Sequence, residues 1–188
     1  MGGMAAQRKT EIKRFMRTQT RPRRDLVLLL HDVEDPVNVG SAFRIADALR
    51  VEALLLSGIT PRPPHKLITK VGRAKDRRVP WRGVDDVGAT LAELGADGYR
   101  RLSVEITADA HPYQSYAYPE RVCLLVGNED HGVPDKVGAL CDDAVFLPMY
   151  GKGASLNVHV ALGVVAFHAL HATEGVRGSA VDPSGISA

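Results

Sequence analysis

Short apolar runs alternate with segments of helical periodicity along most of this 188-residue chain. Continuous apolar runs of this kind are typical of strands that are buried on both faces of a sheet. We predict strands at residues 26–30, 53–56, 102–106, 122–126 and 144–147. Strands that alternate with helices predict an α/β fold, in which a mostly parallel sheet is covered by helices on both faces.

Three segments between these runs have the spacing of helices. The first follows a turn at Asp35-Pro36, where Asn38 suits a helix N-cap, and it runs to about Arg50. The second covers residues 84–94 and can end at Gly95, and the third is a short helix near residues 135–140. Residues 58–64 are rich in proline, so we expect a loop there.

The last helical segment, residues 155–171, is apolar on nearly its whole circumference. Its large apolar residues are Leu156, Val158, Val160, Leu162, Val164, Val165, Phe167 and Leu170. A helix that is apolar all round must be buried all round, yet the last helix of a folded chain should meet its own core with only one face. We expect a second copy of the protein to cover the other face. The alternative is a centrally buried helix in a monomer.

Two polar residues open this segment. Ser155 stands where an N-cap belongs. Asn157 comes early in an otherwise apolar helix, where an amide without partners would be unfavourable to bury. We therefore expect Asn157 to form a specific hydrogen bond.

Length and composition suit one α/β domain, which we place at residues 25–173. A basic extension, residues 1–24, precedes it, and a Gly/Ser-rich tail that we expect to be disordered, residues 174–188, follows it. The first residues lack the apolar region of a signal peptide, and the run at 26–30 is too short to cross a bilayer. Cys123 and Cys141 lie in apolar segments without CxxC spacing, so we expect reduced thiols. We therefore expect a cytoplasmic protein.

The net charge of +2 hides a strong asymmetry. Residues 1–24 hold eight basic residues against Glu11, and residues 65–82 hold seven against Asp76. The rest of the chain has 9 basic and 20 acidic residues. Two basic segments on an acidic body are typical of a surface that binds a polyanion, although each could be only a solvated face. The residues that we expect to contact the polyanion are Arg14, Arg17, Arg21, Arg23, Arg24, Lys70, Arg73 and Lys75.

Two familiar nucleotide-binding patterns are missing from the chain. It has no GxGxxG sequence, and the stretch from Gly151 to Ser155 lacks the order of a phosphate-binding loop, because Gly follows its lysine. Instead, Gly127 and Pro148 each come directly after a predicted strand. Ligands of open α/β sheets bind outside the carboxyl ends of strands, so these two loops predict a crevice large enough for an adenosine.

Three segments, in this order and spacing, resemble the motifs of the SpoU (TrmH-type) branch of the SPOUT RNA methyltransferases. They are residues 38–44, residues 127–132, and residues 147–149 running on to 155–158. The resemblance covers roughly residues 25–171. It implies a deep C-terminal trefoil knot, S-adenosylmethionine as cofactor, methylation of a ribose 2′-oxygen on RNA, and a homodimer built through the last helix.

The resemblance also implies roles for individual residues. The implied cofactor contacts are Val126, Gly127, Leu147, Met149 and Leu156. The implied catalytic residues are Arg44, Asn38, Glu129, Ser155 and Asn157. His159 stands where the family usually has a small residue, and we expect it to pack at the subunit contact. No histidine has supporting ligands nearby, so we expect no metal site.

Arg44 is the residue on which the chemistry depends most. The family proposal makes this arginine the base that deprotonates the ribose hydroxyl, but a guanidinium does not deprotonate readily. A second role is electrostatic, in which the guanidinium stabilises the developing alkoxide and grips the adjoining phosphate. A structural alternative is a salt bridge to Asp47 at i+3.

The basic extension and the small size resemble the tRNA-modifying members of the family, so we favour tRNA as the substrate. Gly40-Ser41 differs from the variant typical of the guanosine-18 tRNA enzymes, and the tail lacks a clear helix. Ribosomal RNA is therefore kept as an alternative. The second alternative is a non-catalytic RNA-binding module with the same fold.

Overall fold

The computed structural model describes residues 9–153 and 155–172. Its helices are α1 (Lys9–Arg17), α2 (Pro36–Leu49), α3 (Lys66–Val71), α4 (Val87–Ala96), α5 (Asp135–Gly138) and α6 (Val158–His171), with a 3₁₀ turn η1 (Lys75–Arg77). Its strands are β1 (Asp25–His31), β2 (Ala53–Ser57), β3 (Trp81–Val84), β4 (Arg100–Val104), β5 (His111–Pro112), β6 (Arg121–Val126) and β7 (Asp143–Phe146). The tail predicted at 174–188 lies outside the described residues.

These strands form one sheet in the order β3-β2-β1-β6-β4-β7-β5, and all neighbouring strands are parallel. At its centre, Leu28 of β1 lies between Leu54 of β2 and Leu124 of β6. The prediction of a parallel α/β sheet is confirmed. The trefoil knot stays a prediction, because the segment from 147 to 158 includes residue 154, which is not among the described residues.

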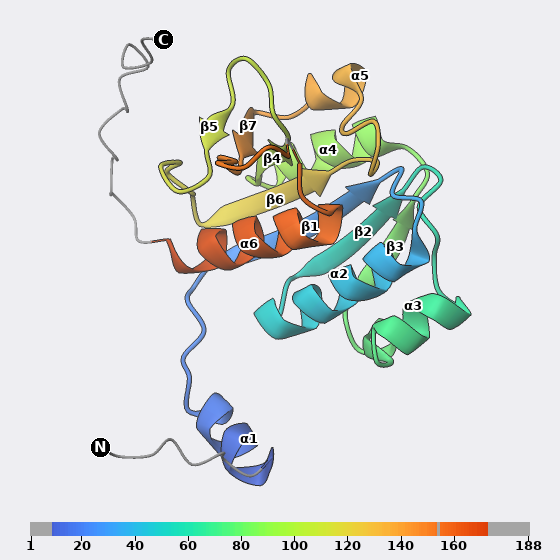
Figure 1. Cartoon of the computed structure of the whole chain (residues 1–188), viewed down its shortest axis with the longest axis vertical. Coiled ribbons are helices and arrows are strands. Elements are labelled where there is room, and N and C mark those ends of the chain that lie inside the picture. Colours follow the sequence, from blue (N-terminus) through green and yellow to red (C-terminus); the bar gives the residue numbers. More distant parts are fainter. Residues whose placement is uncertain (1–8, 154, 173–188) are drawn as a thin grey trace.

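Helices cover both faces of the sheet (Figure 1). On one face, α2 and α6 pack over a core that contains Leu28, Phe43 and Leu162. On the other face, α4 and α5 pack over a second core that contains Leu29 and Leu91. Consecutive residues of β1 thus serve opposite cores, which is why the strand reads as an unbroken apolar run.

The elements that the sequence pattern did not predict are short or polar. β3 is an edge strand in which only Val84 is buried, and β5 has two residues. The helix predicted to start at residue 84 begins at Val87, because the carboxylate of Asp86 caps it by accepting from the N–H of Ala89. Helices α1 and α3 lie in the two basic segments, where we predicted no helix, although Ile12, Phe15 and Met16 of α1 have helical spacing.

Helix α2 begins earlier than predicted. Asp35, and not Asn38, is its N-cap and accepts a hydrogen bond from the N–H of Val37. Pro36 occupies the first helical turn, where its missing N–H has no consequence. Asn38 therefore lies inside the helix, and its side chain is free for other contacts.

Two arginines at the amino end of β1 attach the basic extension to the domain. Arg24 is 6% exposed, and its guanidinium donates to four backbone carbonyl oxygens, those of Tyr118, Pro119, Ala169 and Ala172. Arg21 donates to the carbonyl oxygens of Pro22, Arg24 and Leu49. The ends of α2 and α6 are thus held against the start of β1. Across the described ranges, no helix is both long and apolar enough to cross a membrane.

Candidate active site

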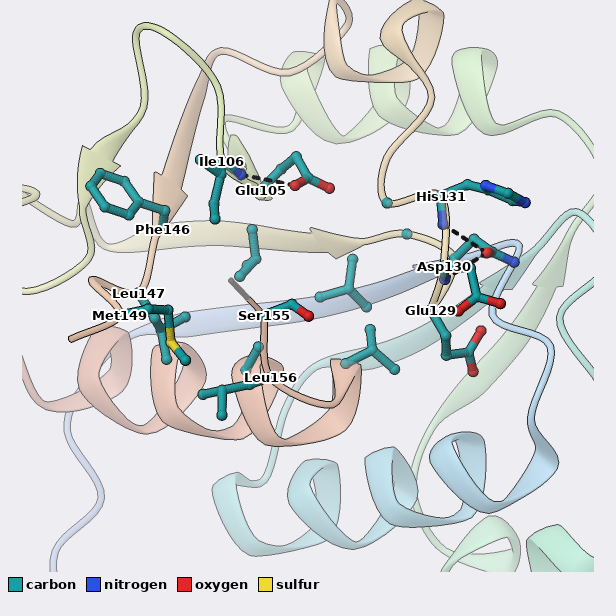
Figure 2. Close-up of a pocket in the computed structure, with 17 residues that line it drawn as sticks. Glu105, Ile106, Glu129, Asp130, His131, Phe146, Leu147, Met149, Ser155 and Leu156 are labelled. Carbon is teal, nitrogen blue, oxygen red and sulfur yellow. Dashed lines mark hydrogen bonds between the residues drawn. The ribbon is translucent and has the colours of Figure 1, made fainter. Parts of the chain in front are cut away.

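A cavity of about 330 Å³ lies at the carboxyl ends of β4, β6 and β7, beside the start of α6 (Figure 2). All five residues for which the resemblance implies cofactor contact line it, namely Val126, Gly127, Leu147, Met149 and Leu156. Val104, Ile106 and Phe146 add further apolar surface. The polar part includes the carboxylates of Glu105, Glu129 and Asp130.

The loop after β6 folds back on itself at the edge of this cavity. Asn128 and Gly132 exchange two backbone hydrogen bonds of 2.9 Å. A Cβ atom on Gly127 would lie 2.1 Å from the carbonyl oxygen of Gly132. The glycine is therefore required by the loop itself, whereas we predicted from the sequence that it makes room for a ligand.

Glu105, which the sequence analysis did not single out, holds the other end of this loop. Its Oε2 accepts a hydrogen bond of 2.9 Å from the N–H of Val133. A Cβ atom on Gly132, where φ is +67°, would lie 2.2 Å from the same oxygen. The signal that could have identified Glu105 is an acidic residue at the carboxyl end of a parallel strand, where ligands bind.

Glu129 connects the loop after β6 to the start of α2. Its carboxylate accepts hydrogen bonds from the N–H groups of Glu34 (2.9 Å) and Asp35 (3.1 Å) and from Nδ2 of Asn38 (2.7 Å). Burial raises the pKa of Glu129, but these hydrogen bonds outweigh burial and lower the pKa below its ordinary value. The first and second motif segments are therefore in direct contact.

Asn38 is buried, with 3% of its surface exposed, and its amide also reaches α6. Its Oδ1 lies 2.8 Å from Nδ1 of His159. Burial lowers the pKa of the His159 imidazole, and the Asp35 carboxylate partly opposes this effect. The half-buried ring of His159 is thus bonded to Asn38 of the same chain, and its packing at a subunit contact stays a prediction.

The start of α6 differs from the prediction by three residues. Asn157 is the N-cap and accepts a hydrogen bond of 3.1 Å from the N–H of His159. Ser155, the predicted cap, lies before the helix and lines the cavity. Asn157 thus forms the specific hydrogen bond that we expected, but as an exposed helix cap and not as a buried amide.

Arg44 is exposed on α2 and does not line the cavity. Its proposed structural partner, Asp47, pairs instead with Lys75 (2.5 Å) and Arg78 (3.3 Å). Within residues 9–153 and 155–172, Arg44 has no hydrogen bond or ion pair. The salt-bridge explanation of this arginine is therefore excluded.

The eight basic residues predicted to contact RNA fall into two groups. Five have exposed side chains, namely Arg14, Arg17, Arg23, Lys70 and Arg73. The other three have partners within the chain, namely Arg21 and Arg24 on backbone carbonyls and Lys75 on Asp47. The prediction for Arg24 is wrong, because a buried guanidinium with four carbonyl partners is not available to a phosphate. Among the described residues, no cluster of His, Cys, Asp and Glu could hold a metal ion.

Comparison with known proteins gives consistent matches. Residues 25–167 match the model of the SpoU rRNA Methylase family. The chain is 32% identical over 149 residues to a 23S rRNA (guanosine-2'-O-)-methyltransferase of Acinetobacter baylyi, over 77% of this chain and 58% of that protein. It is 26% identical over 160 residues to a tRNA (guanosine(18)-2'-O)-methyltransferase of Escherichia coli, over 85% of this chain and 69% of that protein.

A solved structure agrees with these relatives. The AdoMet-bound rRNA methyltransferase from Sinorhizobium meliloti superposes with a TM-score of 0.73 and 25% identity, over 80% of this chain and 57% of that chain. The chain thus spans less than two thirds of both rRNA enzymes. Because the family model covers most of its length, the chain belongs to the SpoU rRNA methylase family.

Proposed function

We propose that this chain is an S-adenosylmethionine-dependent RNA methyltransferase that modifies a ribose 2′-oxygen. The observation that carries the proposal is that two of the three motif segments line one cavity and that the first is hydrogen-bonded to this lining. Glu129 and Leu156 line that cavity, and Asn38 is bonded to Glu129. The printed activities of the two curated relatives, 2'-O-methylation of rRNA and of tRNA, support the proposal.

The cavity fits S-adenosylmethionine in size and in chemistry. Its volume of about 330 Å³ lies at the lower end of the range for small-molecule sites. Apolar side chains such as Val126, Phe146 and Leu156 suit an adenosine, and the carboxylates of Glu105, Glu129 and Asp130 suit a cationic ligand. When bound there, the cofactor supplies an electrophilic methyl group. The loop 127–133, held by Glu105, shapes one side of the site.

Arg44 has an electrostatic role in this proposal. Its exposed guanidinium, without a partner in the described part of the chain, can bind the phosphate beside the target ribose and stabilise negative charge on the 2′-oxygen. The role of base is less suitable, because a guanidinium keeps its proton at physiological pH. Ser155 offers a hydroxyl at the cavity, and Asn157 fixes the start of α6 next to it.

We favour tRNA as the substrate and keep ribosomal RNA as the alternative. The match to the tRNA enzyme covers more of both chains than the match to the 23S rRNA enzyme, 85% and 69% against 77% and 58%. The higher identity to the rRNA enzyme, 32% against 26%, supports the alternative. Either substrate suits a cytoplasmic enzyme whose helices α1 and α3 expose basic residues.

We also propose a homodimer through α6. Val160, Val164 and Phe167 follow one another at helical spacing and are 40%, 38% and 46% exposed in the single chain. Leu156, just before the helix, is 44% exposed. A second copy would remove this apolar stripe from water, which is the main driving force of association.

Two measurements test the proposal. Calorimetry with S-adenosylmethionine should show binding at one site per chain. Methyl transfer from labelled cofactor to total tRNA and to ribosomal subunits, followed by nuclease mapping, should find a 2′-O-methylated nucleotide in tRNA. Labelling of ribosomal RNA alone would favour the alternative substrate. RNA binding without cofactor binding would indicate a non-catalytic module.

A further inference from the structure

The hydrogen bonds of Asn38 determine which nitrogen of His159 carries a hydrogen. The carboxylate of Glu129 only accepts, so the group of Asn38 that lies 2.7 Å from it is the Nδ2 amine. Oδ1 of Asn38 therefore faces His159, and this oxygen also only accepts. Nδ1 of His159, 2.8 Å away, must then be the donor. In a neutral imidazole the other nitrogen is an acceptor, so Nε2 of His159 has a free lone pair.

Nothing in the described part of the chain occupies that lone pair. Asn38 is the hydrogen-bond partner of the His159 ring, and it takes up Nδ1. Nε2 is also not among the buried polar atoms that lack a partner, so the half-buried ring leaves it open to solvent or to a ligand. A histidine held in one tautomer with an open Nε2 is arranged to accept a proton.

His159 stands at the edge of the cavity and not inside it. Its neighbours Val158 and Ala161 line the cavity, as does Glu129, whereas His159 does not. Figure 2 shows the side chain of Glu129 pointing from its loop toward α2, where Asn38 receives it. A group in the lining would contact the cofactor, but a ribose hydroxyl has to approach from the edge. His159 therefore lies just outside the lining, on the side of α6 that faces α2.

We propose that Nε2 of His159 accepts the proton of the ribose 2′-hydroxyl, an inference that rests on the proposed function. The oxygen forms its bond to the transferred methyl carbon as its O–H bond breaks, and the proton moves to Nε2. The electron pair of the broken methyl–sulfur bond stays on the sulfur, which becomes neutral. The imidazolium keeps its Nδ1–H on Asn38, and the charge of Glu129 beyond that amide stabilises it. Release of the proton to water restores the neutral ring.

Few other charged groups act on this ring. Asp35, the N-cap of α2, favours the protonated form, and Glu129 lies on the far side of Asn38. Arg44 lies on α2 less than two turns beyond Asn38. The strands under α6 carry their charges at their amino ends, where Arg100 pairs with Asp143 and Arg121 with Asp25. Burial lowers the pKa of His159 from its ordinary value, which favours the neutral ring that can act as a base.

The first experiment reads the tautomer without cofactor or RNA. Long-range ¹H–¹⁵N correlation spectra of the full chain should show a His159 ring that is protonated at Nδ1 and bare at Nε2, assigned by the signal that His159→Asn removes. Asn38→Ala should release this tautomer preference. A ring protonated at Nε2 in the wild-type protein would overturn the inference, whatever the enzyme methylates.

The second experiment separates proton acceptance from positioning. His159→Asn retains an N–H donor close to the place of Nδ1, so it can still hold Asn38, but it lacks Nε2. We expect its single-turnover methylation rate to fall by about 10²–10⁴-fold, with cofactor and RNA affinities within threefold of wild type. The acid limb of the wild-type pH–rate profile, which we assign to protonation of this ring, should disappear in the variant.

Two other histidines serve as comparisons. His171→Asn, at the exposed end of α6 where the ring contacts the carbonyl of Phe167, should behave as wild type. His131 lines the cavity, although Figure 2 shows its ring pointing away from it. Loss of the acid limb in His131→Asn instead of His159→Asn would overturn the inference. An unchanged rate in His159→Asn would do the same, because the ring would then only position Asn38.

If wild-type protein methylates no RNA, the proposed function fails, and the tautomer measurement still tests the geometry.

Discussion

Two arginines of this chain are used in opposite ways, Arg24 at the amino end of β1 and Arg44 on α2. At the amino end of β1, Arg24 is buried and its guanidinium donates to four carbonyl oxygens. On α2, Arg44 is exposed and has no partner within the described ranges. A guanidinium whose donors are used up by the fold holds chain segments together, whereas one that the fold leaves open can serve a ligand. The number of hydrogen bonds that the fold makes to a charged side chain therefore separates structural from functional charges better than position in the sequence does.

The first prediction concerns the open arginine. Arg44→Ala should lower 2′-O-methylation by at least about 10²-fold, because removing one preorganised donor to developing negative charge has effects of that size. Cofactor affinity and melting temperature should stay close to wild type, since Arg44 neither lines the cavity nor bonds within the described chain. Arg44→Lys should restore only part of the rate, because an ammonium lacks the bidentate geometry. Near-normal turnover of Arg44→Ala would remove this residue from the mechanism.

The second prediction concerns the saturated arginine. Arg24→Ala should lower the free energy of unfolding by roughly 3–5 kcal/mol, since it leaves several buried carbonyl oxygens without donors. Urea denaturation measures this change, and RNA affinity of the folded protein should hardly alter. Arg23→Ala is the matched control, because Arg23 is exposed beside it. A stable Arg24→Ala variant with weakened RNA binding would contradict the structural role that we assign to Arg24.

The third prediction concerns the loop at the carboxyl end. Gly127→Ala should weaken S-adenosylmethionine binding by more than about tenfold, because a Cβ 2.1 Å from the Gly132 carbonyl oxygen forces the loop open. Gly138→Ala is the control, since its Cβ would meet its nearest atom at 3.9 Å. Calorimetry measures the affinity of each variant for S-adenosylmethionine. Unchanged affinity in a folded Gly127→Ala protein would place the cofactor elsewhere.

The sequence predicted the parts of the fold and site that depend on apolar pattern or on position after a strand. The central strands were of this kind, whereas the residues around the cavity, such as Val126 and Leu156, were implied by the resemblance to the SpoU family. It could not predict contacts between segments far apart in the chain. Arg24 looked like any other basic residue of the extension until its carbonyl partners, about 95 and 145 residues away, were known. The Asn38–His159 hydrogen bond joins residues 121 positions apart and left no local trace.

The fourth prediction tests the proposed dimer through α6. Arg24 holds the end of α6, and the exposed stripe of that helix contains Val164. Val164→Asp should shift a dimer toward monomers at micromolar concentration, because it puts a charge into an apolar contact. Leu67→Asp, equally exposed on α3, should leave the sedimentation coefficient unchanged. A wild-type protein that sediments as a stable monomer would contradict the proposed dimer.

The smallest effect is expected from shortening the basic extension, residues 1–24, because only part of it is available to RNA. Residues 10–20 are exposed, whereas Arg21 and Arg24 are bound to backbone carbonyls. Deleting residues 1–20 and keeping these two arginines should therefore preserve stability and cofactor binding. The log–log slope of RNA affinity against salt should flatten by about 0.7–0.9 for each phosphate contact that is lost. Affinity should fall similarly for every RNA tested, since contacts with phosphates carry little sequence information.

Lys70→Ala with Arg73→Ala, which changes the exposed basic residues of the other segment, should flatten the remaining slope further. If the deletion leaves the slope unchanged, the extension is only a solvated segment, and RNA binding rests on α3 and the loops around the cavity.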